Sequence, residues 1–408
     1  MITIQPIPRA LVPIDSDAAA RVSAPNYDEF QGDREIWELL QSTPESVLAV
    51  TMAHCDAPTF EAVAAGDSAE SRARAAANMK RLIDSPLTRA MSRILYCYEI
   101  VDPERPGVRQ IGLGGMGRTD EIRTDATPEG PIIRNEGVRE PKARGRARLI
   151  EATSAIIGTV NNAVPDPSGR FSSSLEAYAD ARPPDFEVRD AAGNAHRIWI
   201  IGEPGEIARF QHLLSEEPEA YVADGNHRSA AAAMLGYDFF LTVFFPADRM
   251  GIKAYNRLVR APLDRSALAG ALDIVGPAPE TPYQPAKIHD LGVYSAAEGW
   301  LALRPRDGSY DPTDAAASID HAIVQDRLFA SALGIEDAGD ARLTFVGANK
   351  DAAWLQREVD EGRAEFAVTI PPVTMTQFIQ VCRQGRMMPP KSTWFEPKIR
   401  SGLVMALI

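Results

Sequence analysis

Residues 221–228 read Tyr-Val-Ala-Asp-Gly-Asn-His-Arg, and this stretch marks the point where a strand passes into a helix. Ala220 to Ala223 are apolar enough to end a strand, and the alanine-rich run Ser229 to Leu235 predicts a helix. Between them, Gly225 permits the positive φ that such a turn requires. Phe239 to Phe245 then predict a fully apolar strand. The sequence therefore predicts a compact strand–turn–helix–strand unit in a protein of mixed α/β type.

The turn itself gathers an acid, a histidine and an arginine within five residues, namely Asp224, His227 and Arg228. The helix start after Gly225 and Asn226 offers backbone N–H groups, and the arginine adds a planar fork of donors, so an anion such as phosphate is the natural ligand. The alternative is a capped turn, in which the aspartate satisfies backbone donors and the histidine only packs. Both interpretations remain open on turn chemistry alone.

The run Gly112-Leu-Gly-Gly-Met-Gly117 has the GxGxxG spacing of a dinucleotide-binding loop. That loop must open a long amphipathic helix, whereas here residues 118–125 are polar and are followed by Pro128 and Gly130. We therefore expect a glycine-rich strand or turn.

Two further segments combine charges in a suggestive way. Glu136 is followed by a run of basic residues. The glutamate could be a site carboxylate among cations, or the segment could be a solvated loop that leads into a basic helix. The basic residues are Arg139, Lys142, Arg144, Arg146 and Arg148. Residues 388–398 join stiffening prolines to Lys391, Ser392, Thr393 and Lys398, which could clamp a phosphate or form an ordered surface turn. Pro390 before the lysine excludes a Walker A loop.

Periodicity predicts the remaining elements. We expect helices over Pro58 to Leu82 and Arg146 to Asn161, and a β-hairpin from Ile94–Ile100 and Val108–Leu113. The Pro- and Gly-rich stretch Pro165 to Pro184 is expected to be a surface excursion. A break between Pro262 and Pro285 divides the chain into residues 1–262 and a C-terminal lobe, 263–408.

The bulk composition narrows the functional classes. The 408 residues carry a net charge of -13, which repels polyanions, so neither DNA nor an anionic membrane is an expected partner. Cys55, Cys97 and Cys382 lie far apart without metal-ligand spacing and are expected to be core thiols. The N-terminus lacks a signal-peptide pattern, and no run reaches about 18 apolar residues, so we expect a cytoplasmic protein.

Nearly the whole chain resembles the domain-of-unknown-function family 1015, which is related to the ParB/sulfiredoxin-like fold and to free-serine kinases. The resemblance rests on residues 24–28, 136–146, 223–228, 255–257 and 390–398, followed by Gly402-Leu403. It implies an α+β fold with a ParB/sulfiredoxin-like nucleotide-binding core in residues 1–262 and an added C-terminal lobe that contributes Lys391–Lys398 to the site.

The residues that keep the family pattern suggest a phosphate-binding frame, and those that depart from it suggest changed substrate-facing groups. Glu136, Asp224, His227, Arg228, Lys391 and Lys398 keep the pattern. Asn26, Asn135, Val138, Gly145 and Asn226 depart from it.

The function that the resemblance implies is nucleotide-dependent phosphoryl transfer, from ATP or ADP with Mg²⁺, to the hydroxyl of a small amino acid or similar metabolite. Glu136, His227 and Asp224 are then the candidate catalytic residues, with Asp224 also a candidate Mg²⁺ ligand. The candidate nucleotide- and phosphate-binding residues are Gly225, Asn226, Arg228, Arg146, Lys391, Ser392, Thr393 and Lys398.

Other functions stay open on these residues. A nucleotide-binding switch without kinase activity would use the same pocket, and so would a phosphatase or phospholyase acting on a phosphorylated amino acid. Sulfiredoxin-like repair is excluded, because it would need a nucleophilic cysteine where Asn226 stands and the three cysteines lie far away in sequence. A homo-oligomer is compatible with the sequence.

Overall fold

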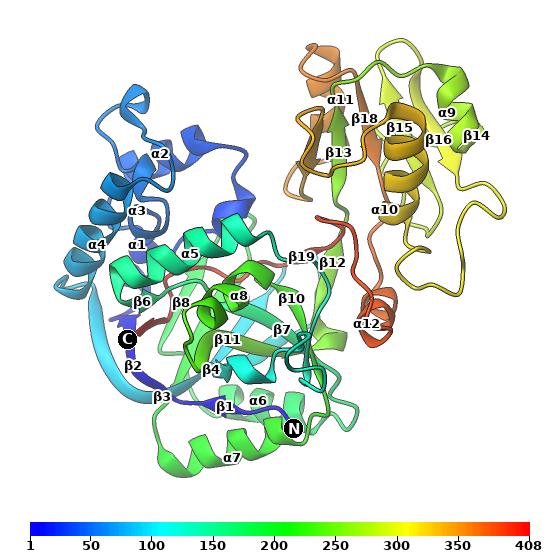
Figure 1. The fold of residues 1–408 in the computed structure, drawn as a ribbon. Coiled ribbons are helices and arrows are strands. Elements are labelled where there is room, and N and C mark those ends of the chain that lie inside the picture. Colours follow the sequence, from blue (N-terminus) through cyan, green and yellow to red (C-terminus); the bar gives the residue numbers. More distant parts are fainter. The chain divides into compact units, whose positions relative to one another are not determined.

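The computed structural model describes residues 1–408 throughout, apart from the side chain of Asp28. The chain divides into two compact units. The first comprises residues 1–134, 138–250 and 397–408, and the second comprises residues 135–137 and 251–396 (Figure 1). Each unit combines helices with a sheet, which confirms the mixed α/β class.

The first unit is built on a mixed sheet with the strand order β5-β10-β7-β11-β4-β3-β2-β20-β6. In addition, β1 pairs with β4, β9 pairs with β3, and β8 pairs with β9. The strands are β1 (Ile4–Gln5), β2 (Ile7–Pro13), β3 (Thr88–Val101), β4 (Gln110–Arg118), β5 (Ile132–Arg134), β6 (Ala155–Ile156), β7 (Val160–Val164), β8 (Phe186–Arg189), β9 (Ala195–Ile201), β10 (Ala220–Asp224), β11 (Phe239–Pro246) and β20 (Met405–Leu407).

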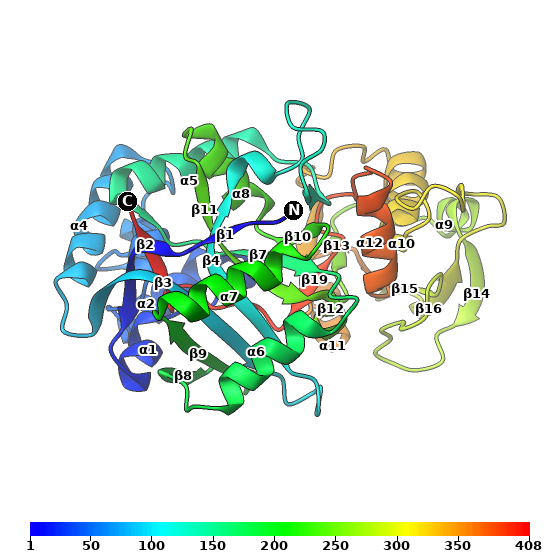
Figure 2. The ribbon, with the colours of Figure 1, turned by 90° about the horizontal axis from the view of Figure 1, so that it is seen from below.

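Helices cover both faces of this sheet. Figures 1 and 2 show α6 and α7 on one face and α5 and α8 on the other. The helices of the first unit are α1 (Ser16–Val22), α2 (Asp33–Ser42), α3 (Leu48–Thr51), α4 (Ala69–Ile83), α5 (Glu140–Thr153), α6 (Arg170–Asp180), α7 (Pro204–Ser215) and α8 (Asn226–Met234), with short 3₁₀ turns η1 (Tyr27–Glu29), η2 (Ala53–Cys55), η3 (Phe60–Ala62), η4 (Thr119–Glu121) and η5 (Ala247–Arg249).

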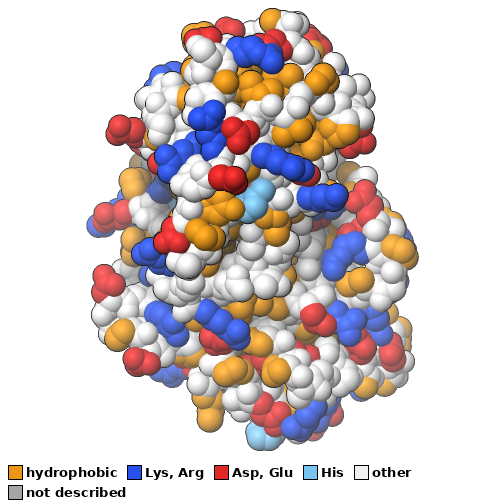
Figure 3. Space-filling model, turned by 90° about the vertical axis from the view of Figure 1, so that its right-hand side faces the viewer, with side chains coloured by type: hydrophobic (Ala, Val, Ile, Leu, Met, Phe, Trp, Pro, Cys, Tyr) orange, Lys and Arg blue, Asp and Glu red, His pale blue; other side chains and the backbone are white. Residues whose placement is uncertain are grey.

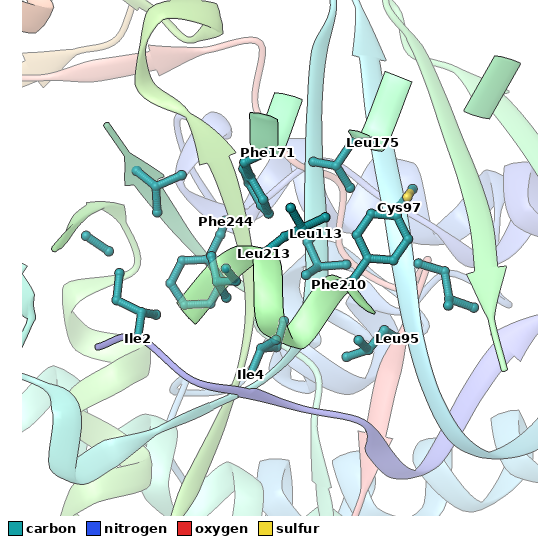
Figure 4. Close-up of a cluster of buried hydrophobic side chains, with 14 of the residues drawn as sticks. Ile2, Ile4, Leu95, Cys97, Leu113, Phe171, Leu175, Phe210, Leu213 and Phe244 are labelled. Carbon is teal, nitrogen blue, oxygen red and sulfur yellow. The ribbon is translucent and has the colours of Figure 1, made fainter. Parts of the chain in front are cut away.

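Burial of apolar side chains from α6 and α7 against the strands holds one side of this sandwich together. Figure 4 shows Phe171 of α6 and Phe210 of α7 packed with Leu113 of β4 and Phe244 of β11. All four side chains are buried, and burying each such residue contributes about 1.5–3 kcal/mol. The sheet is thereby fixed as the platform from which β10 and α8 extend.

The predicted strand–turn–helix–strand unit is confirmed as β10, α8 and β11. The predicted hairpin is confirmed as β3 and β4, which pair antiparallel with Tyr96 opposite Gly114. The glycine-rich run 112–117 lies within β4 as expected. A Cβ on Gly114 would lie 2.1 Å from the Tyr96 ring, so the glycine there makes room for a neighbouring strand.

Three expectations about helices were wrong. The helix expected over 58–82 begins only at Ala69, because Ser68 caps it through a bond to the Ser71 N–H. The helix expected over 146–161 is α5, which ends at Thr153 because Ser154 adopts a left-handed conformation. The surface excursion expected over 165–184 contains α6, whose Phe171, Leu175 and Tyr178 are buried.

The second unit has a sheet of strand order β14-β16-β15-β18-β13-β17 and a two-stranded sheet of β12 and β19. Its strands are β12 (Gly251–Lys253), β13 (Asn256–Val259), β14 (Asp273–Pro277), β15 (Leu291–Ser295), β16 (Gly299–Arg304), β17 (Leu343–Val346), β18 (Phe366–Thr369) and β19 (Trp394–Glu396). Its helices are α9 (Arg265–Ala271), α10 (Asp320–Ile323), the π-helix η6 (Val324–Ala332), α11 (Ala352–Asp360) and α12 (Met375–Arg383).

This division differs from the boundary expected at residue 262, for reasons of strand pairing. β12 pairs with β19, and β13 pairs with β17 and β18, so residues 251–262 belong to the second unit. At the other end of the chain, β20 pairs with β2 and β6, which places residues 397–408 in the first unit. Lys391–Lys398 is therefore shared between the two units.

Surface charges of both signs are mixed (Figure 3), and the three cysteines are buried. On the face shown in Figure 3, basic and acidic side chains are interspersed. Cys55, Cys97 and Cys382 are buried and form no disulfide, which confirms that all three lie in the interior as thiols. Within residues 1–408 as the structure describes them, no helix is both long and apolar enough to cross a membrane.

Candidate functional site

The turn between β10 and α8 is shaped by a glycine. Gly225 has φ 105°, and a Cβ there would lie 3.2 Å from the Val160 backbone and 2.9 Å from the Arg228 side chain. A side chain at this position is therefore excluded by both conformation and space. The turn delivers the chain directly into α8, whose first N–H groups are aimed out of the helix N-terminus beside Asn226 and His227.

Arg228 is nearly buried, and two polar side chains hold its guanidinium. Its guanidinium lies 3.0 Å from Asp224 Oδ1 and donates to Asn26 Oδ1 at 3.4 Å, and its side chain is only 10% exposed. Its aliphatic stem passes over Gly158, where a Cβ would lie 2.7 Å from the arginine Cδ. The guanidinium is therefore oriented before any ligand arrives.

Lys398 approaches the same carboxylate from the far end of the sequence. Its Nζ lies 3.4 Å from Asp224 Oδ2, and its side chain is 9% exposed. Asn26 fixes this segment, because its Nδ2 donates to Ile399 O at 3.1 Å and its Oδ1 accepts from Ser401 Oγ at 3.1 Å. The two oxygens of Asp224 thus each face one cation, and the cluster of three charges carries a net positive charge.

His227 connects α8 to the start of α5. Its Nε2 accepts a hydrogen bond of 3.0 Å from the backbone N–H of Arg139, the N-cap residue of α5. That acceptor role places the ring proton on Nδ1 in the neutral imidazole. The nitrogen that a general base would use is therefore already engaged in this structure.

A cavity of about 300 Å³ lies beside the turn, at the lower end of the range for ligand pockets. Its walls include His227, Lys142 and Arg146, the last two on one face of α5, and Tyr27. Figure 1 shows α5 and α8 side by side. A smaller adjoining cavity of about 40 Å³ shares Tyr27 and Arg146 and also includes Arg228.

The charge of the larger cavity is predominantly positive. Asp67, also in its wall, is engaged by Arg72 and Arg148, and hydrogen bonding from Arg148 holds the pKa of its carboxyl below the ordinary value. Among the described residues, Lys142 and Arg146 have no acidic partner, although the Arg146 guanidinium stacks 3.9 Å above the Tyr27 ring. These two cations remain available to an anionic ligand.

The remaining predicted site residues belong to the second unit. There, Glu136 forms a β-bridge with Met388, and the Met388 N–H donates to Asn135 O at 2.9 Å. Lys391 adopts φ 60° with its Nζ 5.5 Å from the centre of the Tyr255 ring. The second unit thus holds one carboxylate and one lysine of the expected set.

Ser392 and Thr393 follow Lys391 in the second unit. The Ser392 hydroxyl is buried and donates to Pro389 O at 2.7 Å, so it closes this turn, and the phosphate contact expected of it stays a prediction. The side chain of Thr393 is half-buried.

Behind Lys391 lies a fully buried arginine. Arg257 donates from its two terminal nitrogens to the backbone oxygens of Tyr255, Asn256 and Lys391. Burial lowers its pKa to about 9. Arg257 therefore braces the backbone that carries Lys391.

His321 packs in the same interior and donates from Nε2 to Tyr255 O at 3.1 Å. Burial, reinforced by the positive charge of Arg257, lowers the pKa of His321 to about 3. The unfolded chain, with a histidine pKa of about 6.5, binds the proton first as pH falls. The stabilising contribution of neutral His321 is therefore fully present above the unfolded pKa of about 6.5 and is lost as the pH falls toward the folded pKa of about 3. Acidification from about pH 7 to about pH 4 should therefore lower the unfolding free energy of the second unit by about 3 kcal/mol through this group.

Urea unfolding as a function of pH, followed by tryptophan fluorescence, measures this effect. His321→Gln is the matched variant, because its amide can make the same bond but does not titrate. We expect the variant to lose correspondingly less stability on acidification. An unchanged pH profile would contradict the assignment.

The structure brings together part of the predicted site. Asp224, Gly225, Asn226, His227, Arg228 and Lys398 form one cluster in the first unit, and Arg146 lines the adjoining cavities. Glu136, Lys391, Ser392 and Thr393 lie in the second unit, so their participation in that cluster stays a prediction. Sequence reasoning gave no ligand role to Tyr27, Lys142 or Ser401. The four-residue spacing of Lys142 and Arg146 was the available signal.

The fold and site together define a mixed α/β protein with a cationic cavity at the junction of a strand and a helix N-terminus. The chain belongs to the family described as "Protein of unknown function (DUF1015)", whose sequence model matches residues 4–328. A comparison with curated proteins gives no match.

Several solved structures are similar to this chain at low sequence identity. A free serine kinase in complex with AMP is 13% identical, with a TM-score of 0.38, covering 71% of this chain and 92% of its own. A conserved hypothetical protein from Pyrococcus furiosus is 13% identical, with a TM-score of 0.36, covering 70% and 92%. SbnI with a C-terminal truncation, from Staphylococcus aureus, is 12% identical, with a TM-score of 0.38, covering 68% and 85%.

Proposed function

We propose that this protein transfers a phosphoryl group between a nucleotide, ATP or ADP, and the hydroxyl of a small amino acid or similar metabolite. One observation carries the proposal. The turn Asp224–Arg228 opens α8 beside a cavity of about 300 Å³, and the cavity wall holds the cations Lys142 and Arg146 without acidic partners among the described residues. Phosphoryl transfer depends on positioning and on cations around the moving group, and this cavity supplies both.

The roles follow from the contacts. The N-terminus of α8 and the Arg228 fork suit the phosphate oxygens, and Arg146 and Lys142 suit a second anionic group on the nucleotide or acceptor. Because Asp224 already faces Lys398 and Arg228, a Mg²⁺ ion there would have to displace a cation. We therefore assign Asp224 to orienting the two cations and derive no step through a metal at this residue.

Glu136 is the residue that we assign as the base for the acceptor hydroxyl. His227 accepts the Arg139 N–H and Asp224 lies between two cations, so each of these two candidates has a structural role of its own. A carboxylate that accepts a hydroxyl proton as the phosphoryl group transfers is a recurrent arrangement in kinases.

The test has a binding stage and a chemical stage. A thermal-shift panel of ATP, ADP, CTP and phosphoserine, each with and without Mg²⁺, should show a raised melting temperature for at least one nucleotide, because a ligand that binds only the folded state stabilises it. The stabilising nucleotide is then incubated with L-serine or L-threonine, and phosphorus NMR detects the phosphorylated amino acid. L-Alanine, which lacks the hydroxyl, is the control acceptor.

Each outcome decides between functions. Phosphoamino acid formed from a hydroxyl acceptor supports the proposal. Nucleotide binding without product from either acceptor overturns it in favour of a binding switch. Stabilisation by phosphoserine alone, with release of inorganic phosphate, overturns it in favour of a phosphatase.

A further inference from the structure

A separate cluster of potential metal ligands lies at the junction of α2 and η2, in the first unit. Asp33, the first residue of α2, meets His54 and Cys55 of η2, and their ligand atoms all lie within 4.8 Å of one another. His54 and Cys55 are buried, whereas the side chain of Asp33 is 49% exposed. None of the three has a role in the proposed phosphoryl transfer.

The spacing suits a metal better than a hydrogen bond. The His54 Nε2 and Asp33 Oδ1 atoms are 3.3 Å apart, longer than the ~2.7–2.9 Å expected of a charge-assisted hydrogen bond. Two ligands bound to zinc at about 2.0–2.1 Å in tetrahedral geometry lie about 3.3 Å from each other. Asp33 also interacts with the Cys55 thiol, so its carboxylate faces both other donors.

The rest of the His54 ring makes no competing bond. Its Nδ1 is buried and has no hydrogen-bond partner among the described residues, and its Nε2 faces Asp33. A buried histidine that serves only packing commonly has both polar atoms satisfied. The Nε2 atom, whose neighbour is the Asp33 carboxylate, is therefore the ring nitrogen placed to bind an ion.

The segment that carries the two buried donors is braced from several sides. Trp37 and Gln41 of α2 both donate to Ala57 O, at 3.0 and 3.2 Å. From α4, Asn78 donates to the Asp56 carboxylate at 2.8 Å. These bonds fix residues 53–57 against α2 without involving the three donors, so the cluster is pre-organised.

Cys55 completes a mixed donor set. Its side chain is buried, and no step of the proposed phosphoryl transfer uses it. A cysteine beside an imidazole and a carboxylate offers sulfur, nitrogen and oxygen donors of the kind that bind zinc, which displaces the thiol proton on binding.

We propose that Asp33, His54 and Cys55 form a zinc site with three protein ligands and one position open to solvent. The sulfur, nitrogen and oxygen donor set suits Zn²⁺ and disfavours Mg²⁺ or Ca²⁺, which prefer oxygen ligands alone. The exposed side of Asp33 gives the ion a path of entry. Because His54 also lines the 300 Å³ cavity, the ion links α2 to one wall of that cavity.

The test uses the full chain without an affinity tag, stripped of metal and kept reduced. Titration with Co²⁺ should give one ion per chain and a near-ultraviolet thiolate-to-cobalt charge-transfer band, and added Zn²⁺ should displace the Co²⁺ and raise the melting temperature. Cys55→Ser should remove the band, and Asp33→Asn should weaken binding at least about 10- to 100-fold. These readouts need no enzymatic activity, so they stand or fall independently of the proposed function.

Cys382→Ser is the matched control, because Cys382 is also buried and outside any disulfide but lies in the second unit. It should bind Co²⁺ as the unsubstituted protein does. Absence of the charge-transfer band, or unchanged binding in both Cys55→Ser and Asp33→Asn, overturns the proposal. If Cys55→Ser fails to fold, Asp33→Asn decides, because its side chain is half-exposed and the change preserves its shape.

Discussion

Glu136→Gln is expected to lower the rate of phosphoryl transfer about 100- to 10,000-fold while nucleotide affinity changes little. A carboxylate that accepts a proton from the acceptor hydroxyl acts in the transition state, so its loss lowers kcat and kcat/KM together. Within the second unit, Glu136 is held by its bridge to Met388 and lies in the electrostatic field of Arg257. The bridge is a backbone pairing that the substitution preserves, whereas the interaction with Arg257 depends on the charge, so circular dichroism and the melting temperature must first show that the glutamine variant is folded.

Steady-state kinetics with the acceptor identified by phosphorus NMR measures this effect, and calorimetry measures nucleotide affinity separately. Glu140→Gln is the matched control, because Glu140 is exposed and pairs with Arg144. Its rate should match that of the unsubstituted protein. If Glu136→Gln keeps full activity and His227→Asn loses it, the base is the histidine. If neither change matters, the kinase proposal fails.

Arg228→Ala is expected to weaken nucleotide binding about 30- to 1,000-fold, equivalent to about 2–4 kcal/mol, because it removes a buried, oriented guanidinium. The arginine lies between Asp224 and Asn26 and is only 10% exposed. Water that enters the variant therefore cannot fully replace the lost hydrogen bonds to the ligand. Lys398 stays beside Asp224 in the variant, which limits the cost of leaving that carboxylate buried. Isothermal titration with the stabilising nucleotide measures the loss.

The control for this variant is Arg144→Ala on α5, which removes an exposed arginine paired with Glu140. It should bind nucleotide normally. Circular dichroism and the melting temperature must show that Arg228→Ala is folded before its affinity is interpreted. Unchanged affinity in a folded Arg228→Ala protein would remove Arg228 from the binding site.

Much of the site was predictable because its signal is local. A strand, a glycine with positive φ and a helix start follow one another within residues 220–235. Each of these depends on neighbouring residues alone, so the local sequence predicts it. The proximity of Lys398 to Asp224 was expected from the resemblance. Its geometry was not, because it depends on β20 pairing with strands far away in the sequence.

The errors have equally physical causes. The helix expected over 58–82 was too long, because its composition is helical throughout while a cap at Ser68 sets the real start. Helix α6 was missed because Gly and Pro around it outweigh the apolar spacing of Phe171, Leu175 and Tyr178. The unit boundary was misplaced because strand pairing between distant residues overrides local breaks in composition.

The pairing of Leu11 in β2 with Met405 in β20 also has a consequence for biosynthesis. As the chain emerges from the ribosome, the first 250 residues lack a strand that their own sheet requires, and that strand is made only after the whole second unit. Contacts of such long range slow folding, so the second unit has time to fold first. Until β20 docks, an open gap between β2 and β6 exposes unpaired backbone, and nascent chains stalled within the second unit should therefore engage chaperones.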